Sequence, residues 1–149
     1  MKIRKFNTLQ EMNQTHQKEI SDFPIVFMFG HLSNEEIKER IKPLGVKKIQ
    51  ECVSVGAGGV VAKKDLQRYV AMLIQHSKEQ KEFDANSENL YQRILNEMYN
   101  HEYGFTQDPE DTLYALGRDY SDLQDPRFRA AWSKAEKECF RAYEEYCAG

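Results

Sequence analysis

The sequence has no apolar run long enough to cross a membrane. Among its 149 residues the run at residues 25–29 suits a single strand and no apolar run is much longer, whereas a membrane-spanning helix needs about 20 apolar residues. The basic segment at residues 2–5 is not followed by an apolar stretch, so we expect no secretory signal. Cys52, Cys139 and Cys147 form no Cys-x-x-Cys pair. Free thiols in a cytoplasmic protein without membrane contact are therefore predicted.

Sequence motifs for catalysis and for metal binding are also lacking. There is no Gly-x-Ser-x-Gly, no Walker lysine and no Gly-x-Gly-x-x-Gly, which are motifs of nucleophilic enzymes and nucleotide sites. His101 and Glu102 do not begin a zinc-protease motif, because Phe105 stands where the second histidine is needed. The acids at residues 108–111 lack the spacing and the glycine of a calcium loop. We predict no metal and no cofactor, assign no catalytic residue, and favour a protein that is not an enzyme.

Composition and charge are typical of a globular protein. Apolar residues make up 40% of the chain and charged residues 30%, and we expect one domain over residues 1–149. The net charge of −3 is unevenly spread: residues 84–126 carry ten Asp or Glu against two Arg, a net charge of −8. This acidic segment is either a solvated helical face or a surface for a cation or a basic protein partner. Nucleic-acid binding is disfavoured by the overall acidity and by the lack of a recognised motif.

Helix start signals divide the chain into elements. Thr8 with Glu11 and Ser33 with Glu36 fit capping boxes, in which two side chains satisfy free backbone N–H groups. Later starts are marked by Asp65 and by Asp-Pro pairs at residues 108–109 and 125–126. The helices expected from these signals and from apolar spacing span about residues 9–21, 34–42, 65–82, 85–103 and 109–116, and a last helix begins at the second Asp-Pro pair and continues through Tyr146.

Strands are expected in three places and predict the fold class. Residues 23–29, 46–55 and 60–62 have extended character, and the turn at residues 56–59 joins the last two as an antiparallel hairpin. A single helix links the first two strands, so a parallel crossover between them is also open. We predict an α+β fold with a sheet of about three strands, mixed or antiparallel, covered by five to six helices.

Two helices carry apolar stripes that we expect to face inward. One stripe begins at Leu66 and the other, the cleanest in the chain, begins at Phe128. The first contains Leu66, Tyr69, Val70, Leu73 and Ile74; the second contains Phe128, Trp132, Ala135, Cys139, Tyr143 and Tyr146.

The first candidate site is the polar end of the helix expected at residues 85–103. It contains Asn100, His101, Glu102 and Tyr103. The apolar positions of that helix place His101 and Glu102 on its inward face and turn Asn100 and Tyr103 away. A buried carboxylate needs a partner. The group is therefore either a structural plug, with Glu102 accepting hydrogen bonds from the backbone near residues 105–108, or a binding site.

The second candidate is a glycine-rich turn with lysines after it. Gly56, Gly58 and Gly59, followed by Lys63 and Lys64, could bind an anion through exposed N–H groups. A phosphate loop leads from a strand directly into a helix, but here residues 60–62 continue as extended chain. A tight or bulged hairpin turn explains the same glycines.

Three stretches together resemble a family of small uncharacterised proteins. They read FPIVFMFGHLSNEEIKERIKPLG, SVGAGGVVAKKD and NHEYGFTQDPEDTLYALG. The family they resemble is encoded by phages and other mobile elements of gut-type bacteria, and the resemblance covers about residues 23–118. It implies a bacterial or phage cytoplasmic protein and gives added weight to residues 100–103, but it carries no activity.

Two functions are consistent with these features. The first is an accessory protein that is not an enzyme and that binds a macromolecular partner, through the acidic segment 84–126, or associates with itself. The second is a small enzyme or ligand-binding protein with a pocket formed by His101, Glu102 and the turn at residues 56–59. The two differ in whether these stretches meet in one pocket.

Overall fold

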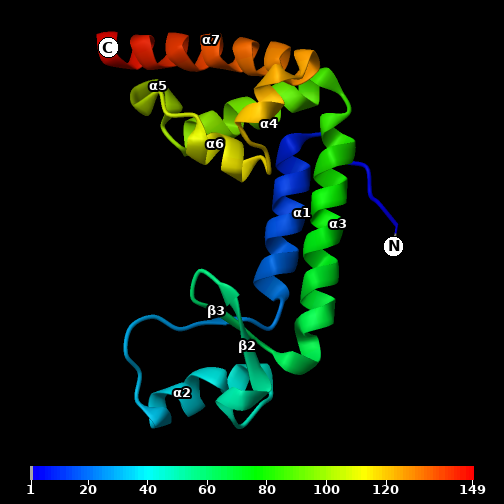
Figure 1. Ribbon diagram of the computed structural model, residues 1–149, viewed down its shortest axis with the longest axis vertical. Coiled ribbons are helices and arrows are strands. Elements are labelled where there is room, and N and C mark those ends of the chain that lie inside the picture. Colours follow the sequence, from blue (N-terminus) through cyan, green and yellow to red (C-terminus); the bar gives the residue numbers. More distant parts are fainter. Residues whose placement is uncertain (1) are drawn as a thin grey trace. The chain divides into compact units, whose positions relative to one another are not determined.

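The computed structural model describes residues 2–149 and combines helices with one small sheet (Figure 1). This confirms the predicted α+β class, although the described chain has seven α-helices, because the short helix Tyr103–Thr106 was not expected as a separate element. None of the described helices has the length and apolarity that crossing a membrane requires. The helices are α1 (Leu9–Asp22), α2 (Asn34–Ile41), α3 (Leu66–Asp84), α4 (Ser87–Asn100), α5 (Tyr103–Thr106), α6 (Glu110–Ala115) and α7 (Pro126–Ala148). The strands are β1 (Val26–Phe27), β2 (Cys52–Gly56) and β3 (Gly59–Ala62).

The described chain divides into two compact units. The first unit contains residues 13–78, and the second contains residues 2–12 and 79–149. The sheet and α2 belong to the first unit, while α4 to α7 belong to the second. Each unit is described by itself below, and the expectation of one domain stays a prediction.

The predicted capping residues begin α1 and α2. The Thr8 hydroxyl accepts a hydrogen bond from the Glu11 N–H at 3.1 Å, and the Ser33 hydroxyl accepts one from the Glu36 N–H at 3.2 Å. The Glu11 carboxylate reaches the N–H of Asn7, one residue before the expected partner. These bonds satisfy N–H groups that a helix leaves free in its first turn.

The sheet of the first unit is entirely antiparallel. Its strand order is β1-β3-β2, with Val26 opposite Val60 and Cys52 opposite Ala62. The predicted β2–β3 hairpin is confirmed, including an irregularity of register between Ser54 and Gly56. The parallel crossover did not form, because β1 pairs with β3 and not with β2.

The first two strands are shorter than the sequence predicted. Residues 49–51 form a 3-10 helix, and β1 keeps only two of the seven expected residues. Pro24 lacks a backbone donor, and Gly30 takes a left-handed conformation with φ 72°, so residues near both ends of the expected strand disfavour pairing. Alternate residues of a strand share one face, and here Phe27 and Phe29 are exposed together.

Each unit has its own apolar core. In the first unit, residues of the sheet pack with the end of α2 and the turn after it: Ile41, Leu44, Cys52, Val60 and Ala62 are buried. In the second unit, α7 packs against α4, α5 and the segment before α7. Its buried residues are Leu90, Ile94, Met98, Tyr103, Leu113, Leu116, Phe128, Ala131, Trp132, Ala135 and Cys139.

The inward face predicted for α3 is wrong in part. Val70, Leu73 and Ile74 are exposed. Within the first unit α3 instead buries His76, which stacks on the buried His16 of α1 with 3.9 Å between ring centroids. Tyr69 of the same stripe contacts the Phe23 ring, whereas Val70, Leu73 and Ile74 stay uncovered within the described chain.

Candidate binding pocket

Helix α4 ends at Asn100, before the polar group that was expected to lie on it. The His101 N–H still bonds to the Glu97 carbonyl at 3.1 Å, but Glu102 takes a left-handed conformation with φ 53° and ψ 37°. An α-helix cannot continue through that conformation, and a residue with a side chain adopts it at a cost of about 1–2 kcal/mol. The short helix α5 then begins at Tyr103 in a new direction.

This break reverses two of the predicted orientations. Glu102, expected to face inward, is exposed, and Tyr103, expected to point away, is buried. The helical wheel failed because it continued α4 by three residues. Asn100 is exposed as predicted. His101 is half-buried, with its Nε2 at 3.4 Å from a carboxylate oxygen of Glu97 one turn earlier.

Tyr103 occupies the structural position that the sequence analysis gave to Glu102. Its hydroxyl donates a hydrogen bond to Glu136 Oε2 at 2.6 Å. Its ring stacks on Phe140 and meets the edge of Trp132, each with 5.6 Å between centroids. Burial, and then the bond to Glu136, raises the pKa of the Tyr103 phenol. The plug interpretation is therefore wrong for Glu102, because no hydrogen bond of its carboxylate is found in the described chain.

Gly104 allows α5 to lie directly against α7. A Cβ atom placed on Gly104 would be 2.9 Å from Tyr143 Cβ and 3.4 Å from the carbonyl oxygen of Cys139. Real Cβ atoms essentially never come this close, so any larger residue would push the two helices apart. The glycine of the Tyr-Asn-His-Glu-Tyr-Gly stretch thus sets the spacing between α5 and α7.

A pocket of about 370 Å³ lies at this junction of α4, α5 and α7. We call it the aromatic pocket, because aromatic rings supply four of its nine lining residues. Phe105 is 69% exposed, and Tyr99 and Tyr146 are exposed as well. The lining consists of Met98, Tyr99, Glu102, Gly104, Phe105, Cys139, Ala142, Tyr143 and Tyr146.

The lining of the aromatic pocket is uncharged except at Glu102. Partial burial raises the pKa of Tyr99, and a hydrogen bond with Cys147 raises the pKa of Tyr143, so both phenols stay protonated at neutral pH. Burial also raises the pKa of the Cys139 thiol, which makes it a poor nucleophile. The pocket combines neutral ring surfaces with one carboxylate.

The acidic segment 84–126 uses most of its carboxylates to hold the second unit together. Seven of its ten acids cap backbone N–H groups, pair with Arg or Lys, or, in the case of Glu97, lie beside a histidine ring. They are Asp84, Glu88, Glu97, Asp108, Asp119, Asp122 and Asp125. Within the described residues, no partner is found for the carboxylates of the other three, Glu102, Glu110 and Asp111.

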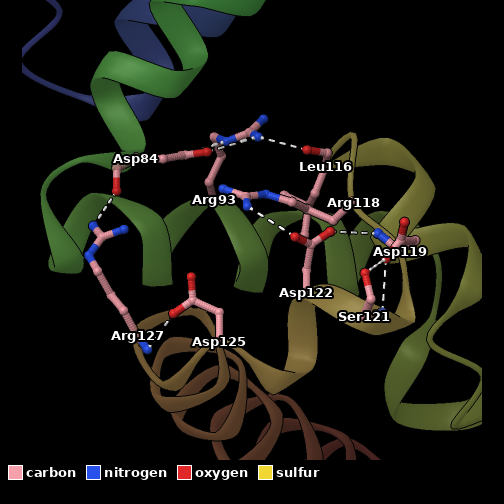
Figure 2. Close-up of polar contacts among 9 residues, drawn as sticks. All are labelled: Asp84, Arg93, Leu116, Arg118, Asp119, Ser121, Asp122, Asp125 and Arg127. Carbon is pink, nitrogen blue, oxygen red and sulfur yellow. Dashed lines mark hydrogen bonds and ion pairs between the residues drawn. The ribbon is translucent and has the colours of Figure 1, made fainter.

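Figure 2 shows the buried ion pair of this segment, Arg93 with Asp84. The guanidinium donates to both carboxylate oxygens, at 2.8 and 3.2 Å, and to the Leu116 carbonyl at 3.4 Å. Arg127 donates to the backbone carbonyl of Asp84. Paired and hydrogen-bonded in this way, the two charges lie in the interior without stranding either one. This pair is a structural element of the fold and offers no open surface to a partner.

Three aspartates further along the segment cap chain turns (Figure 2). Asp119 accepts from the Ser121 N–H at 2.8 Å, and Asp122 accepts from the Asp119 N–H at 2.9 Å. Asp125 begins α7 by accepting from the Arg127 N–H at 2.9 Å. Such capping explains why Asp is frequent just before helices. The acidic residues of this segment therefore serve largely to begin helices and to stabilise turns.

The glycine turn and its lysines do not form one site. Gly56, Ala57 and Gly58 all have positive φ, as a tight hairpin turn requires. Lys63 and Lys64 follow the end of β3, and the four strand residues between them and Gly58 place Lys63 about 16 Å from Gly58 along the chain. The described geometry matches the bulged hairpin alternative, and it does not bring turn and lysines together.

Two other possible sites can be compared with the aromatic pocket. His101 and Glu102 belong to the second unit and the turn at residues 56–59 to the first, so their joint pocket stays a prediction. A broader hollow of about 830 Å³ lies in the first unit between β1 and α2. It is lined by Phe27, three glutamates, Arg40 and aliphatic residues, and it has only one aromatic ring. The aromatic pocket gathers more exposed ring surface in less volume.

Fold and site together define a largely helical α+β protein with an open aromatic pocket in its second unit. The chain belongs to a family of unknown function, DUF7659, whose model matches residues 8–138. That range includes Met98 to Phe105 and Cys139 follows it directly. No curated protein and no solved structure matches the chain. The resemblance seen in the sequence also indicated a family of uncharacterised proteins, and the family match agrees with it on that point.

Proposed function

We propose that the protein is a bacterial or phage accessory protein that binds a macromolecular partner through the aromatic pocket. The observation that carries this proposal is the gathering of exposed aromatic residues around Glu102, a carboxylate without a partner in the described chain. Contiguous exposed apolar surface in a water-soluble fold is typical of interaction sites. Tyrosine and other aromatic residues are the side chains most enriched where proteins bind one another.

The chemistry of the pocket favours binding over catalysis. A general acid or base has to be held within hydrogen-bond reach of the reacting group by neighbouring side chains. Glu102 has no such neighbour among the lining residues, and the raised pKa of Cys139 opposes a nucleophilic role. This lining can hold a ligand by ring stacking and by the shape of the pocket. We therefore propose recognition, without a chemical step.

Self-association is the second candidate, and a different surface favours it. Val70, Leu73 and Ile74 form an exposed apolar stripe on α3 in the first unit. Apolar positions three and four apart on one helix are the pattern by which helices pack together. Sedimentation of the intact protein over a hundredfold range of concentration tests this candidate. A mass that stays at one chain throughout would remove it.

A capture experiment with matched surface variants tests the proposed function. Tagged wild-type protein, Phe105→Ser and Tyr114→Ser are each exposed to a bacterial lysate, and retained proteins are identified by mass spectrometry. Both aromatic residues are well exposed on short helices of the second unit, Phe105 at 69% and Tyr114 at 86%, but only Phe105 lines the pocket. We expect a protein retained by the wild type and by Tyr114→Ser and lost with Phe105→Ser. Equal retention by all three would place the partner elsewhere.

A further inference from the structure

We propose that the aromatic pocket receives a basic side chain, arginine or lysine, from an exposed segment of a polypeptide partner. This inference rests on the proposed function and names the chemistry that the pocket recognises. The charge of the lining, the arrangement of its rings and the volume of the pocket support it.

The charge of the lining points to a cation. Glu102 is the one charged lining residue, it is exposed, and its carboxylate has no partner in the described chain. Arg141, the cation of α7 that precedes the lining residue Ala142 in sequence, is already held by two other carboxylates, Glu138 at 2.6 and 2.9 Å and Glu145 at 2.6 Å. A cation from outside the chain would therefore meet an unopposed negative charge.

The rings of the pocket can bind a cation on their faces. Phe105 and Tyr143 are tilted by 58° with 6.2 Å between centroids, so they form a corner with a ring on each side. Cations are attracted to ring faces within about 6 Å of the centroid. The second unit already uses this contact elsewhere, with Lys134 Nζ at 4.1 Å from the Tyr91 centroid and Arg118 over Phe128 at 5.0 Å.

The size of the pocket suits one side chain. Its volume of about 370 Å³ is near the lower end of the roughly 300–1,000 Å³ range of ligand pockets. The pocket is open, so a side chain can enter while the main chain that carries it stays outside. The net charge of −8 over residues 84–126 favours the approach of a basic segment. These features together favour a polypeptide over a free small cation.

Other classes of ligand fit this lining less well. An anion would face the Glu102 carboxylate directly. A purely apolar group would remove water from that carboxylate without replacing the lost hydrogen bonds, which is unfavourable. A guanidinium satisfies both parts of the lining, because it stacks on aromatic faces and pairs with a carboxylate.

A pair of peptides that differ only in charge tests the inference. Acetyl-Gly-Ser-Arg-Ser-Gly-amide and the same peptide with citrulline in place of arginine are titrated into the intact ¹⁵N-labelled protein. We expect the arginine peptide to shift the amide signals of Tyr99, Gly104 and Phe105. The citrulline peptide should bind about tenfold more weakly, the ratio that corresponds to one charged contact on aromatic and carboxylate groups.

Two variants isolate the role of Glu102. Glu102→Gln should reduce the preference for arginine over citrulline to below about threefold, since it removes the charged contact and keeps the shape. Glu110→Gln is the matched control, because Glu110 belongs to the same acidic segment and lies outside the pocket. It should keep the wild-type preference. Equal loss in both variants would mean that the general negative field, and not the pocket, attracts the peptide.

The remaining outcomes separate this inference from the proposed function. Equal binding of the two peptides, shifts confined to other residues, or no binding of either peptide would overturn the inference. If the capture experiment still loses the retained protein with Phe105→Ser in that case, the proposed function stands and only the proposal of a basic side chain as the ligand is wrong. Tetramethylammonium chloride serves as a further probe. If it shifts the pocket signals while the arginine peptide does not, the pocket binds a free organic cation. The proposal of a polypeptide ligand would then be wrong.

Discussion

Helices α7 and α3 carry similar apolar stripes in sequence but differ in what covers them. On α7, Phe128 and Trp132 are 2% and 1% exposed, whereas Leu73 and Ile74 on α3 are 40% and 45% exposed. Both stripes have the spacing of an amphipathic helix. The spacing therefore predicts the helix and the side that avoids water, but a second segment has to be present to bury that side.

The cover of α7 comes from α4 and from α5, and sequence periodicity did not assign the α5 part to it. Tyr103 and Gly104 of α5 contact α7 because the chain turns sharply at Glu102. The same turn leaves the carboxylate of Glu102 and the ring of Phe105 exposed beside the helix. The break at the end of α4 thus creates the core contact and the aromatic pocket together.

The largest effect is expected from removing the central aromatic residue of the covered stripe. Trp132→Ala should lower the free energy of unfolding by about 3–5 kcal/mol, because it leaves a cavity against Phe128 and Tyr103. Urea denaturation followed by far-ultraviolet circular dichroism measures this loss. Trp132→Phe, which keeps an aromatic ring, should lose clearly less. A loss below about 1 kcal/mol for Trp132→Ala would remove the contrast between α7 and α3.

A smaller effect is expected where α5 meets α7. Gly104→Ala should cost about 1–3 kcal/mol, because the added methyl would overlap Tyr143 Cβ and one of the helices has to move. Thermal unfolding of the variant and the wild type gives the difference. Unchanged stability would show that α5 can move away from α7 at little cost. The width of the pocket would then not be fixed.

The buried phenol of Tyr103 should make the second unit sensitive to alkali. Burial and the bond to Glu136 raise its pKa in the folded protein, so above about pH 10 the unfolded chain loses this proton while the folded chain keeps it. Stability from this group is complete below that pH and is lost as the pH rises further. The free energy of unfolding of Tyr103→Phe should fall less steeply than that of the wild type between about pH 9 and 11. If the free energies of unfolding of the two proteins fell in parallel with pH, the raised pKa assigned to Tyr103 would be contradicted.

The smallest effect in the series is expected on the uncovered stripe of α3. Leu73→Gln keeps helix propensity and removes an apolar side chain that is already partly exposed. The free energy of unfolding should fall by less than about 1 kcal/mol. A loss of the size expected for Trp132→Ala would show that another surface covers Leu73 in solution. In that case the melting temperature should also rise with protein concentration.

Local chemistry predicted much of the fold. The capping residues Thr8, Ser33 and Asp125 mark helix starts in the structure, and the glycines at residues 56–59 mark the hairpin turn. These features depend on neighbours within a few residues, so a sequence reading contains all the information they need. The α+β class followed from the number and order of such signals.

Features that depend on distant residues were not predictable in the same way. The partner of β1 is a strand more than thirty residues later, and Asp84 is neutralised by Arg93 in a pair that periodicity does not reveal. The orientation of Glu102 was missed for a different reason. Nothing in the order of residue types around it signals a left-handed residue, since glutamate seldom adopts that conformation. Glu102 and Gly104 of this stretch line the aromatic pocket, but Glu102 is exposed there instead of facing inward as expected.

The stability of Glu102→Leu tests most directly whether the aromatic pocket is kept for binding and not for folding. The carboxylate is exposed and has no hydrogen bond in the described chain, so its loss strands no donor. In urea denaturation we expect Glu102→Leu to unfold within about 0.5 kcal/mol of the wild type. A destabilisation of about 1–3 kcal/mol would mean that the carboxylate satisfies buried donors. That result would contradict the account and restore a structural role for Glu102.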